Sequence, residues 1–331
     1  MQYQMGNRHF EAESKYLTLD LPDSNDILED SDALRERMQR DGYLLIRGLH
    51  DAQEVLKARG DILRLMADES ALDPNATLMA GVASTELEEL ASSSVRGREH
   101  LKTDSLKRVV YGKRVVSFFD RFLGGESLSY NFQWLRTTGH GAGSTIHYDV
   151  VYMGRGTQNL YTCWTPLGTV TPEMGPLVLC LGSNQWRDVI DTYGKTDVDR
   201  DLTCGYFSKD PAELVDKFGG RWATTTFEPG DVVILSMFMM HASLTNNSKK
   251  YRISCDTRYQ LASEPVDDRW AGPQPRMHDA FWQPGAAIVP VEVSRERWGC
   301  DSSVVELVVE DENLHRVPLD AIEGHRLGSS V

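Results

Sequence analysis

The feature that most constrains the fold is a change of hydrophobic periodicity near residue 127. Before it, apolar residues recur at helical spacing, most clearly over residues 105–123. After it, large residues alternate with small polar ones over residues 128–136, which is typical of a strand with two different faces. Further short β-like runs, separated by Gly-, Pro- and Asn-containing turns, cover residues 145–151, 159–165, 177–181, 223–227, 232–239 and 251–261.

This order of elements predicts a mainly β protein with flanking α-helices. Seven or eight short strands after a helical segment favour a double-stranded β-helix, that is, a jelly-roll, cupin-like core with helices packed on one sheet. We expect one domain over residues 1–330, with a helical N-terminal support (1–126), a jelly-roll core (127–262) and a C-terminal extension (263–331). The polar stretch at about 187–222 is expected to be a surface insertion or lid.

Composition excludes several classes of protein. The 331-residue chain has a net charge of −14, which disfavours nucleic-acid binding. No apolar run approaches the roughly 18 residues of a membrane span, and the first residues lack the apolar core of a secretory signal. The five cysteines are scattered and form no CxxC pair, which favours a reducing compartment. We therefore expect a cytoplasmic protein that binds neither membrane nor nucleic acid.

Three polar residues lie where metal chemistry would need them. On a strand, His147 and Asp149 share a face, although a His-x-Asp triplet alone more often marks a surface pair. His241 ends an apolar run, an unusual place for a polar ring unless a backbone carbonyl satisfies it. Two histidines and one carboxylate form a facial triad, which leaves three adjacent positions open on Fe(II).

An arginine and a serine complete the pattern. Arg252 follows His241 by eleven residues, which is enough for a turn and a return strand. Its forked guanidinium suits the carboxylate at the far end of a bound dicarboxylate. Ser254 shares the strand face of Arg252 and can donate a second hydrogen bond.

Together these residues resemble the phytanoyl-CoA dioxygenase family of Fe(II)- and 2-oxoglutarate-dependent oxygenases. The resemblance runs from about Leu34 to Gln260, which is most of the chain. It rests on the segment 34–48, on the middle stretches 164–167 and 171–184, and on the segment 241–260. One departure is Gly-Ser-Asn at residues 182–184, where the family often has Pro-Gly-Ser-His.

The resemblance implies a role for each of these residues. His147, Asp149 and His241 would bind Fe(II), and Arg252 with Ser254 would hold the 5-carboxylate of 2-oxoglutarate. O₂ would be the second cosubstrate. The expected reaction is the oxidation, with hydroxylation favoured, of an unactivated C–H bond of a small-molecule substrate, with release of succinate and CO₂.

Two alternatives stay open at this point. Related halogenases carry Gly or Ala in place of the carboxylate, so Asp149 disfavours halogenation. A non-catalytic metal-binding jelly roll would keep the triad, but it would have no need of Arg252 and Ser254.

Three further residues are weaker candidates. Gln133 could contact the 1-carboxylate of 2-oxoglutarate or the substrate, or it could simply face outward from its strand. Arg258 lies at even spacing from Arg252, so it could face the cavity and meet an acidic group of the substrate. Asp256, on the same strand face, is expected to pair with an arginine.

A basic run also calls for interpretation. Between Arg96 and Arg114 there are seven Lys and Arg residues against two acids. Such a run is usually a solvated helix face. The alternative is that Arg96 and Arg98 lie at the cavity mouth and attract an anionic substrate.

Overall fold

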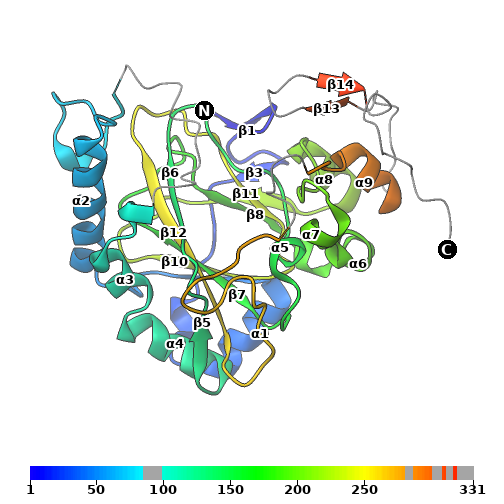
Figure 1. Cartoon of the computed structure of the whole chain (residues 1–331), viewed down its shortest axis with the longest axis horizontal. Coiled ribbons are helices and arrows are strands. Elements are labelled where there is room, and N and C mark those ends of the chain that lie inside the picture. The colour runs from blue at the N-terminus through cyan, green and yellow to red at the C-terminus, as the bar shows by residue number, and fades with distance from the viewer. Residues whose placement is uncertain (85–98, 280–285, 300–307, 311–315, 319–331) are drawn as a thin grey trace.

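The structure is a computed structural model, and it describes residues 1–84, 99–279, 286–299, 308–310 and 316–318. Two β-sheets occupy the centre of the molecule (Figure 1). Helices α2 to α4 lie on one side of the sheets, and the helices α6 to α9 lie on the other (Figure 1). No helix within the described ranges is long and apolar enough to cross a membrane.

The larger sheet provides one wall of the candidate site. Its strands run in the order β4 (Tyr43–Ile46), β10 (Val232–Ser236), β7 (Tyr161–Pro166), β12 (Arg252–Leu261) and β5 (Ser127–Ser129), and β6 (Trp134–Thr138) also pairs with β12. All these pairings are antiparallel. Because side chains alternate along a strand, Arg252, Ser254, Asp256 and Arg258 share one face of β12, whereas Ile253 and Cys255 point to the other.

The smaller sheet provides the opposite wall. Its order is β11 (His241–Ser243), β8 (Leu177–Leu181), β9 (Arg221–Ala223) and β3 (Leu17–Thr18). A buried apolar cluster joins the two sheets, with Leu45, Trp164, Val233 and Leu235 from the larger sheet and Leu177, Leu179 and Ala223 from the smaller one. Two facing sheets with a core between them are the jelly-roll arrangement that the sequence predicts.

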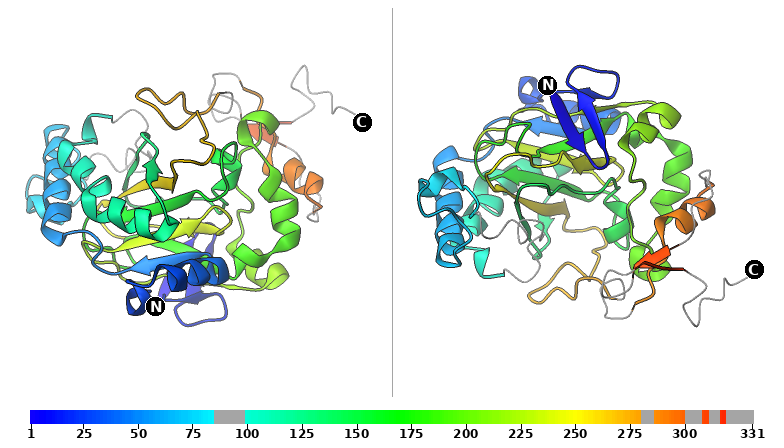
Figure 2. Two further views of the ribbon diagram at one scale, coloured as in Figure 1. Left: turned by 90° about the horizontal axis from the view of Figure 1, so that it is seen from below. Right: turned by 90° about the horizontal axis from the view of Figure 1, so that it is seen from above.

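Four helices cover the outer face of the larger sheet. They are α1 (Ser31–Asp41), α2 (Ala52–Asp68), α3 (Asp104–Val110) and α4 (Lys113–Leu123), and Figure 2 shows α2 and α3 together at one side of the sheets. The carboxylates of Asp30 and Asp51 accept hydrogen bonds from the first backbone N–H groups of α1 and α2. In α4, the ring of Phe119 stacks on the ring of Tyr259 at a centroid distance of 4.0 Å.

The helix predicted over residues 105–123 is instead two helices, α3 and α4. Gly112 separates them with extended backbone (φ −70°, ψ 164°) and forms the N-cap of α4. A Cβ atom at Gly112 would lie 2.2 Å from the carbonyl oxygen of Arg108, so a larger residue does not fit. The break lets Val109 and Phe118 reach two different apolar clusters.

Four predicted strands also differ from the structure. The strand expected over residues 223–227 is β9, which ends at Ala223, and the strand expected over residues 232–239 is β10, which ends at Ser236. The strand expected over residues 128–136 is interrupted, because residues 130–133 lie between β5 and β6 without regular pairing. The strand expected over residues 145–151 is reduced to isolated bridges at Ile146 and His147, followed by the short helix α5 (Val150–Met153). An apolar run this short does not distinguish a strand from a buried helix.

The segment predicted as a surface insertion or lid is a packed layer of short helices. It contains α6 (Arg187–Asp191), α7 (Val198–Asp201) and α8 (Pro211–Phe218). Tyr193, Val198 and Phe207 within it are fully buried. Arg269 of the C-terminal extension is also fully buried, and it pairs with Asp199 of α7. The segment is therefore joined to the core and to the C-terminal extension.

The remaining elements lie at the periphery. The N-terminal hairpin consists of β1 (Gln2–Met5) and β2 (Arg8–Glu11). The C-terminal extension contains α9 (Val291–Arg297) and the strand pair β13 (Val308–Glu310) and β14 (Arg316–Pro318). The described 3₁₀ turns are η1 (Asn25–Ile27), η2 (Leu78–Ala80), η5 (Glu99–Leu101), η6 (Ser183–Gln185) and η7 (Tyr193–Lys195).

Candidate metal centre

The structure brings His147, Asp149 and His241 together. His241 is the first residue of β11, and its backbone exchanges two hydrogen bonds of 3.0 and 3.1 Å with the backbone of His147. The Nε2 atoms of His147 and His241 lie 3.7 and 3.9 Å from Oδ1 of Asp149. One potential ligand atom from each of the three residues lies within 4.8 Å of the others. Asp149 reaches this point because it begins helix α5, not because it continues a strand.

Both imidazole rings are oriented by backbone carbonyls. Nδ1 of His147 donates to the carbonyl oxygen of Thr145 at 2.7 Å, and Nδ1 of His241 donates to that of Met239 at 2.9 Å. Since Nδ1 donates to a carbonyl oxygen, the neutral form of each ring has its lone pair on Nε2, which faces Asp149. Burial and the adjacent His241 lower the pKa of His147 to about 3, so this ring is neutral at physiological pH.

The two oxygens of Asp149 have different surroundings. Oδ1 faces the two histidines, whereas Oδ2 lies 3.2 Å from Nη2 of Arg258 and accepts a hydrogen bond from the hydroxyl of Thr162. Burial acts to raise the pKa of Asp149, but Arg258, the two histidines and Thr162 outweigh it and hold the pKa well below its usual value. Asp149 is therefore an ionised carboxylate with one oxygen available.

This donor set fits a metal ion. Two neutral imidazole nitrogens and one carboxylate oxygen are the facial triad of non-heme Fe(II) oxygenases, in which the remaining positions stay open. The backbone contacts at both Nδ1 atoms fix the rings, as partners of metal-bound histidines do.

Arg252 lies buried without an acidic partner. Its side chain is on the inner face of β12, and Nη1 donates to the hydroxyl of Ser254 at 2.7 Å. Within the described part of the chain it forms no ion pair, and its Nε atom has no hydrogen-bond partner. Burial and the nearby Arg136 lower the pKa of Arg252 to about 10, so the group stays a cation at neutral pH. A buried cation of this kind fits a carboxylate ligand.

Arg258 does not lie free in a cavity. Its guanidinium is almost fully buried, its carboxylate partner is Asp149, and it stacks 4.4 Å from the ring centre of Trp134. Asp256 pairs with Arg136 at 3.0 Å, as the sequence led us to expect.

Gln133 lies away from these groups. The register of β6 places Trp134 opposite Asp256 and Arg136 opposite Ser254, so the neighbouring Gln133 falls on the other face of the sheet. There it lies against the hydroxyl of Tyr111, which packs with the outer helices. This placement does not support a contact between Gln133 and the cosubstrate.

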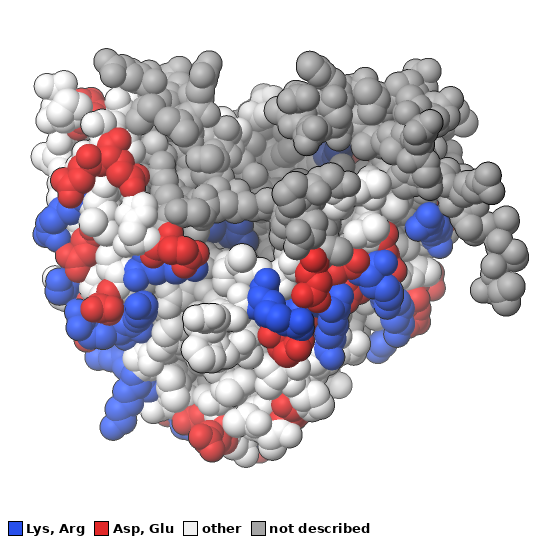
Figure 3. Space-filling view, viewed as in Figure 1, with Lys and Arg blue, Asp and Glu red and all other residues white. Residues whose placement is uncertain are grey.

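The basic run is only partly described, because Arg96 and Arg98 lie outside the described residues. Within the described part, Lys102, Lys107 and Arg114 each pair with an acid, namely Glu99, Asp104 and Asp51. Figure 3 shows blue side chains interspersed with red ones over this side of the molecule. Lys107 and Arg114 are therefore exposed cations with acidic partners, whereas the side chain of Lys102 is only 15% exposed and its Nζ atom lies 4.4 Å from the ring centre of Phe132.

Two residues of the site were missed in the sequence. Thr162 and Arg136 each lie two positions from a large aromatic residue on the same strand, Trp164 and Trp134. Their even spacing places them on the inner face, so the alternation itself was the available signal.

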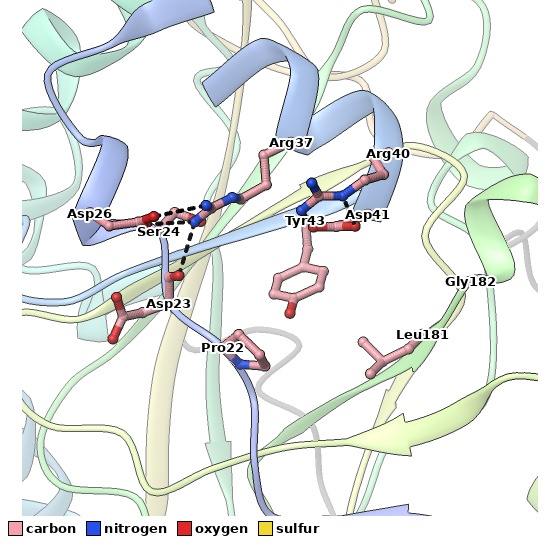
Figure 4. Close-up of a pocket in the computed structure, with 10 residues that line it drawn as sticks. All are labelled: Pro22, Asp23, Ser24, Asp26, Arg37, Arg40, Asp41, Tyr43, Leu181 and Gly182. Atoms are coloured by element: carbon pink, nitrogen blue, oxygen red, sulfur yellow. Dashed lines mark hydrogen bonds and ion pairs between the residues drawn. The ribbon is translucent and has the colours of Figure 1, made fainter. Parts of the chain in front are cut away.

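A separate pocket of about 540 Å³ opens near the start of β4 (Figure 4). Its two arginines are paired internally, Arg37 with Asp26 and Arg40 with Asp41. Its lining includes none of the triad residues. It therefore has no evident part in the metal chemistry.

Comparison with known proteins places these features in a family. A family model described as phytanoyl-CoA dioxygenase (PhyH) matches residues 38–254, well over half of the chain. The 1-deoxypentalenic acid 11-beta-hydroxylase of Streptomyces exfoliatus is 27% identical over 260 residues, covering 74% of this chain and 86% of the hydroxylase.

Solved structures agree on the fold. The epimerase SnoN, in complex with Fe³⁺, alpha-ketoglutarate and nogalamycin RO, aligns with a TM-score of 0.53 and 18% identity, covering 79% of this chain and 93% of SnoN. EctD from S. alaskensis aligns with a TM-score of 0.52 and 19% identity, covering 82% of this chain and 91% of EctD. These likenesses confirm the jelly-roll fold class. The chain belongs to the phytanoyl-CoA dioxygenase family and is an Fe(II)- and 2-oxoglutarate-dependent dioxygenase.

Proposed function

We propose that His147, Asp149 and His241 hold the iron, and that the enzyme hydroxylates a C–H bond of a small-molecule substrate. In this proposal one atom of O₂ enters the substrate and the other enters succinate, while 2-oxoglutarate loses CO₂. The observation that carries the proposal is the convergence of the triad on the same inner space as Arg252, a buried cation with no acidic partner in the described residues.

Each residue has a defined task. The iron and 2-oxoglutarate, when bound, would supply the electrons that reduce O₂ and so activate it for attack on a C–H bond. The triad fixes the metal through Nε2 of each histidine and Oδ1 of Asp149. Arg252 and Ser254 bind the 5-carboxylate and orient the cosubstrate toward the triad. A non-catalytic metal-binding protein would gain nothing from leaving a guanidinium buried and unpaired.

The direct test is substrate-stimulated turnover. Iron-loaded protein, 2-oxoglutarate and O₂ are incubated with candidate small molecules, and succinate and oxidised product are measured together. We expect one class of compound to raise succinate formation in step with its own hydroxylation. If the iron-loaded protein neither binds 2-oxoglutarate nor converts it to succinate, the proposal fails.

We further propose that the substrate carries a carboxylate that binds Arg136. The Arg136 side chain is 36% exposed, and only its Nε atom has a partner, Asp256, among the described residues. Burial acts to lower the pKa of Arg136, but Asp256 and Asp149 raise it, so the group is a cation close to the triad. The relative from S. exfoliatus has an acid in its name, which supports this substrate class.

The charge balance on the inner face of the larger sheet also favours a substrate with a carboxylate. Among the residues that the structure describes, this face carries three guanidinium groups (Arg136, Arg252 and Arg258) and two carboxylates (Asp149 and Asp256). One positive charge therefore remains. A divalent metal and a doubly charged cosubstrate cancel each other, so the excess persists, and a monocarboxylate would neutralise it.

The Arg136→Met variant tests this assignment. For a carboxylic acid that the wild-type enzyme hydroxylates, we expect kcat/KM of the variant to fall about 100-fold. A charge-assisted contact contributes roughly 1.5–3 kcal/mol. The methyl ester of the same acid should be a poor substrate for both enzymes. The exposed Arg276, which pairs with Asp268, provides the control variant Arg276→Met. Equal turnover of acid and ester by the wild type would contradict an acid site, and a raised 2-oxoglutarate requirement would reassign Arg136 to the cosubstrate.

The Asp149→Gly variant distinguishes hydroxylation from halogenation. We expect it to lose hydroxylation, because the metal keeps only two protein ligands. The change also leaves Arg258 and Thr162 facing an empty position that suits a chloride ion. Product analysis by mass spectrometry in chloride buffer is the measurement. A chlorinated product from the wild-type enzyme would overturn the hydroxylase assignment.

A further inference from the structure

We infer that Arg258 and Thr162 form a clamp that holds Asp149 so that it offers a single oxygen to the metal. The inference rests on the proposed role of Asp149 as a ligand. It replaces the expectation that Arg258 meets an acidic group of the substrate, because the acid that Arg258 meets is Asp149.

The clamp is built from two paired strands. Arg258 on β12 and Thr162 on β7 are direct cross-strand partners, so their side chains leave the sheet side by side on the inner face. Both contact the same atom, Oδ2 of Asp149. All three residues are almost fully buried, with exposed fractions of 2–3%. An ion pair in such surroundings has a defined geometry and little screening.

Arg258 itself is held from several sides. Its guanidinium lies over the ring of Trp134, its Nε contacts Sδ of Met153 at 3.1 Å, and Nη1 reaches the carbonyl oxygen of Thr257 at 3.4 Å. Nη2 is left to face Asp149. Trp134 is supported in turn by Trp270 of the C-terminal extension, at a centroid distance of 5.1 Å. The clamp is therefore rigid before any metal binds.

No local structure would otherwise orient Asp149. Asp149 precedes helix α5, but its side chain makes no capping hydrogen bond to that helix. A carboxylate next to a metal can bind through one oxygen or through both. With Oδ2 engaged by Arg258 and Thr162, only Oδ1 is free, and it faces the two histidines. Single-oxygen binding preserves the three open positions that 2-oxoglutarate and O₂ need.

The matched pair Thr162→Val and Thr257→Val tests the clamp. Both replace a buried threonine with a residue of about the same shape, but the Thr257 hydroxyl has no hydrogen-bond partner among the described residues and does not contact Asp149. The readouts are the visible charge-transfer band and the dissociation constant of 2-oxoglutarate, both measured with Fe(II) under anaerobic conditions. We expect Thr162→Val to shift the band and to weaken 2-oxoglutarate binding about 10-fold, the lower range for partners of metal ligands. Thr257→Val should change neither.

Arg258 variants extend the test. Arg258→Met should weaken 2-oxoglutarate binding by up to about 100-fold, and Arg258→Lys should restore part of the loss because it keeps the charge. If Arg258→Met does not fold, the threonine pair still decides the question. An unchanged band and affinity in Thr162→Val would overturn the clamp. A wild-type protein that gives no such band with Fe(II) and 2-oxoglutarate would instead count against the proposed function.

Discussion

Replacing His241 with alanine should remove bound Fe(II) and dioxygenase activity together. The triad supplies three ligand atoms within 4.8 Å of one another, and a metal held by three protein ligands binds weakly when one is lost. His147→Ala should have the same effect. Iron content after anaerobic dialysis and succinate formation are the two measurements, and both should fall to the background of the metal-free protein.

His140 provides the control for this experiment. It is an exposed histidine whose Nδ1 lies 3.2 Å from the carbonyl oxygen of Ser248, away from the triad atoms. His140→Ala should keep its iron and its turnover. Full iron occupancy in both triad variants would show that the ligand assignment is wrong.

The convergence of the triad could be predicted from the sequence, although one reason for it was wrong. The alternation of a strand was expected to place His147 and Asp149 on one face. In the structure His147 forms a β-bridge but Asp149 does not, and Asp149 turns inward immediately before α5. His241 was expected to close the apolar strand before it, but β10 ends at Ser236 and His241 begins β11 of the smaller sheet. Two residues so close in sequence converge in either geometry, so this prediction tolerated an error in secondary structure.

The partners of these residues could not be predicted. Thr162 and Arg258 meet because β7 and β12 pair in one particular register, and register depends on tertiary packing that a single sequence does not reveal. The same limit explains why the sequence did not show on which face of the sheet Gln133 lies. Its position opposite Trp134 was recognised, but which face of the sheet would be the inner one was not.

The helices of the N-terminal support show a second limit of prediction from the sequence. Apolar periodicity continued through residues 105–123, so it gave no sign that α3 and α4 contact different clusters. Gly112 was the local sign of a break, but an isolated glycine is often tolerated inside a helix. Only the close approach of the Arg108 carbonyl shows that glycine is required there.

Replacing Arg252 with alanine should raise the 2-oxoglutarate requirement about 100- to 1,000-fold and leave Fe(II) binding largely intact. Arg252 would make two charge-assisted hydrogen bonds to the 5-carboxylate, together about 3–4 kcal/mol, and each 1.4 kcal/mol is a tenfold change. The KM for 2-oxoglutarate and the anaerobic iron content are the measurements. Arg252→Lys keeps the charge but loses the forked guanidinium, so its KM for 2-oxoglutarate should lie between those of the wild type and Arg252→Ala.

The stability of the metal-free protein provides an independent check of the same role. In the described residues Arg252 is buried and forms no ion pair, so before ligand binds its charge is a cost to folding rather than a contribution. The Arg252→Ala variant should therefore unfold at about the same temperature as the wild type, or higher. What it should lose is the rise in Tm that 2-oxoglutarate gives the wild-type protein, because that rise reports binding to the folded state. A variant that keeps both this rise and the wild-type dependence on 2-oxoglutarate would show that the cosubstrate carboxylate binds elsewhere.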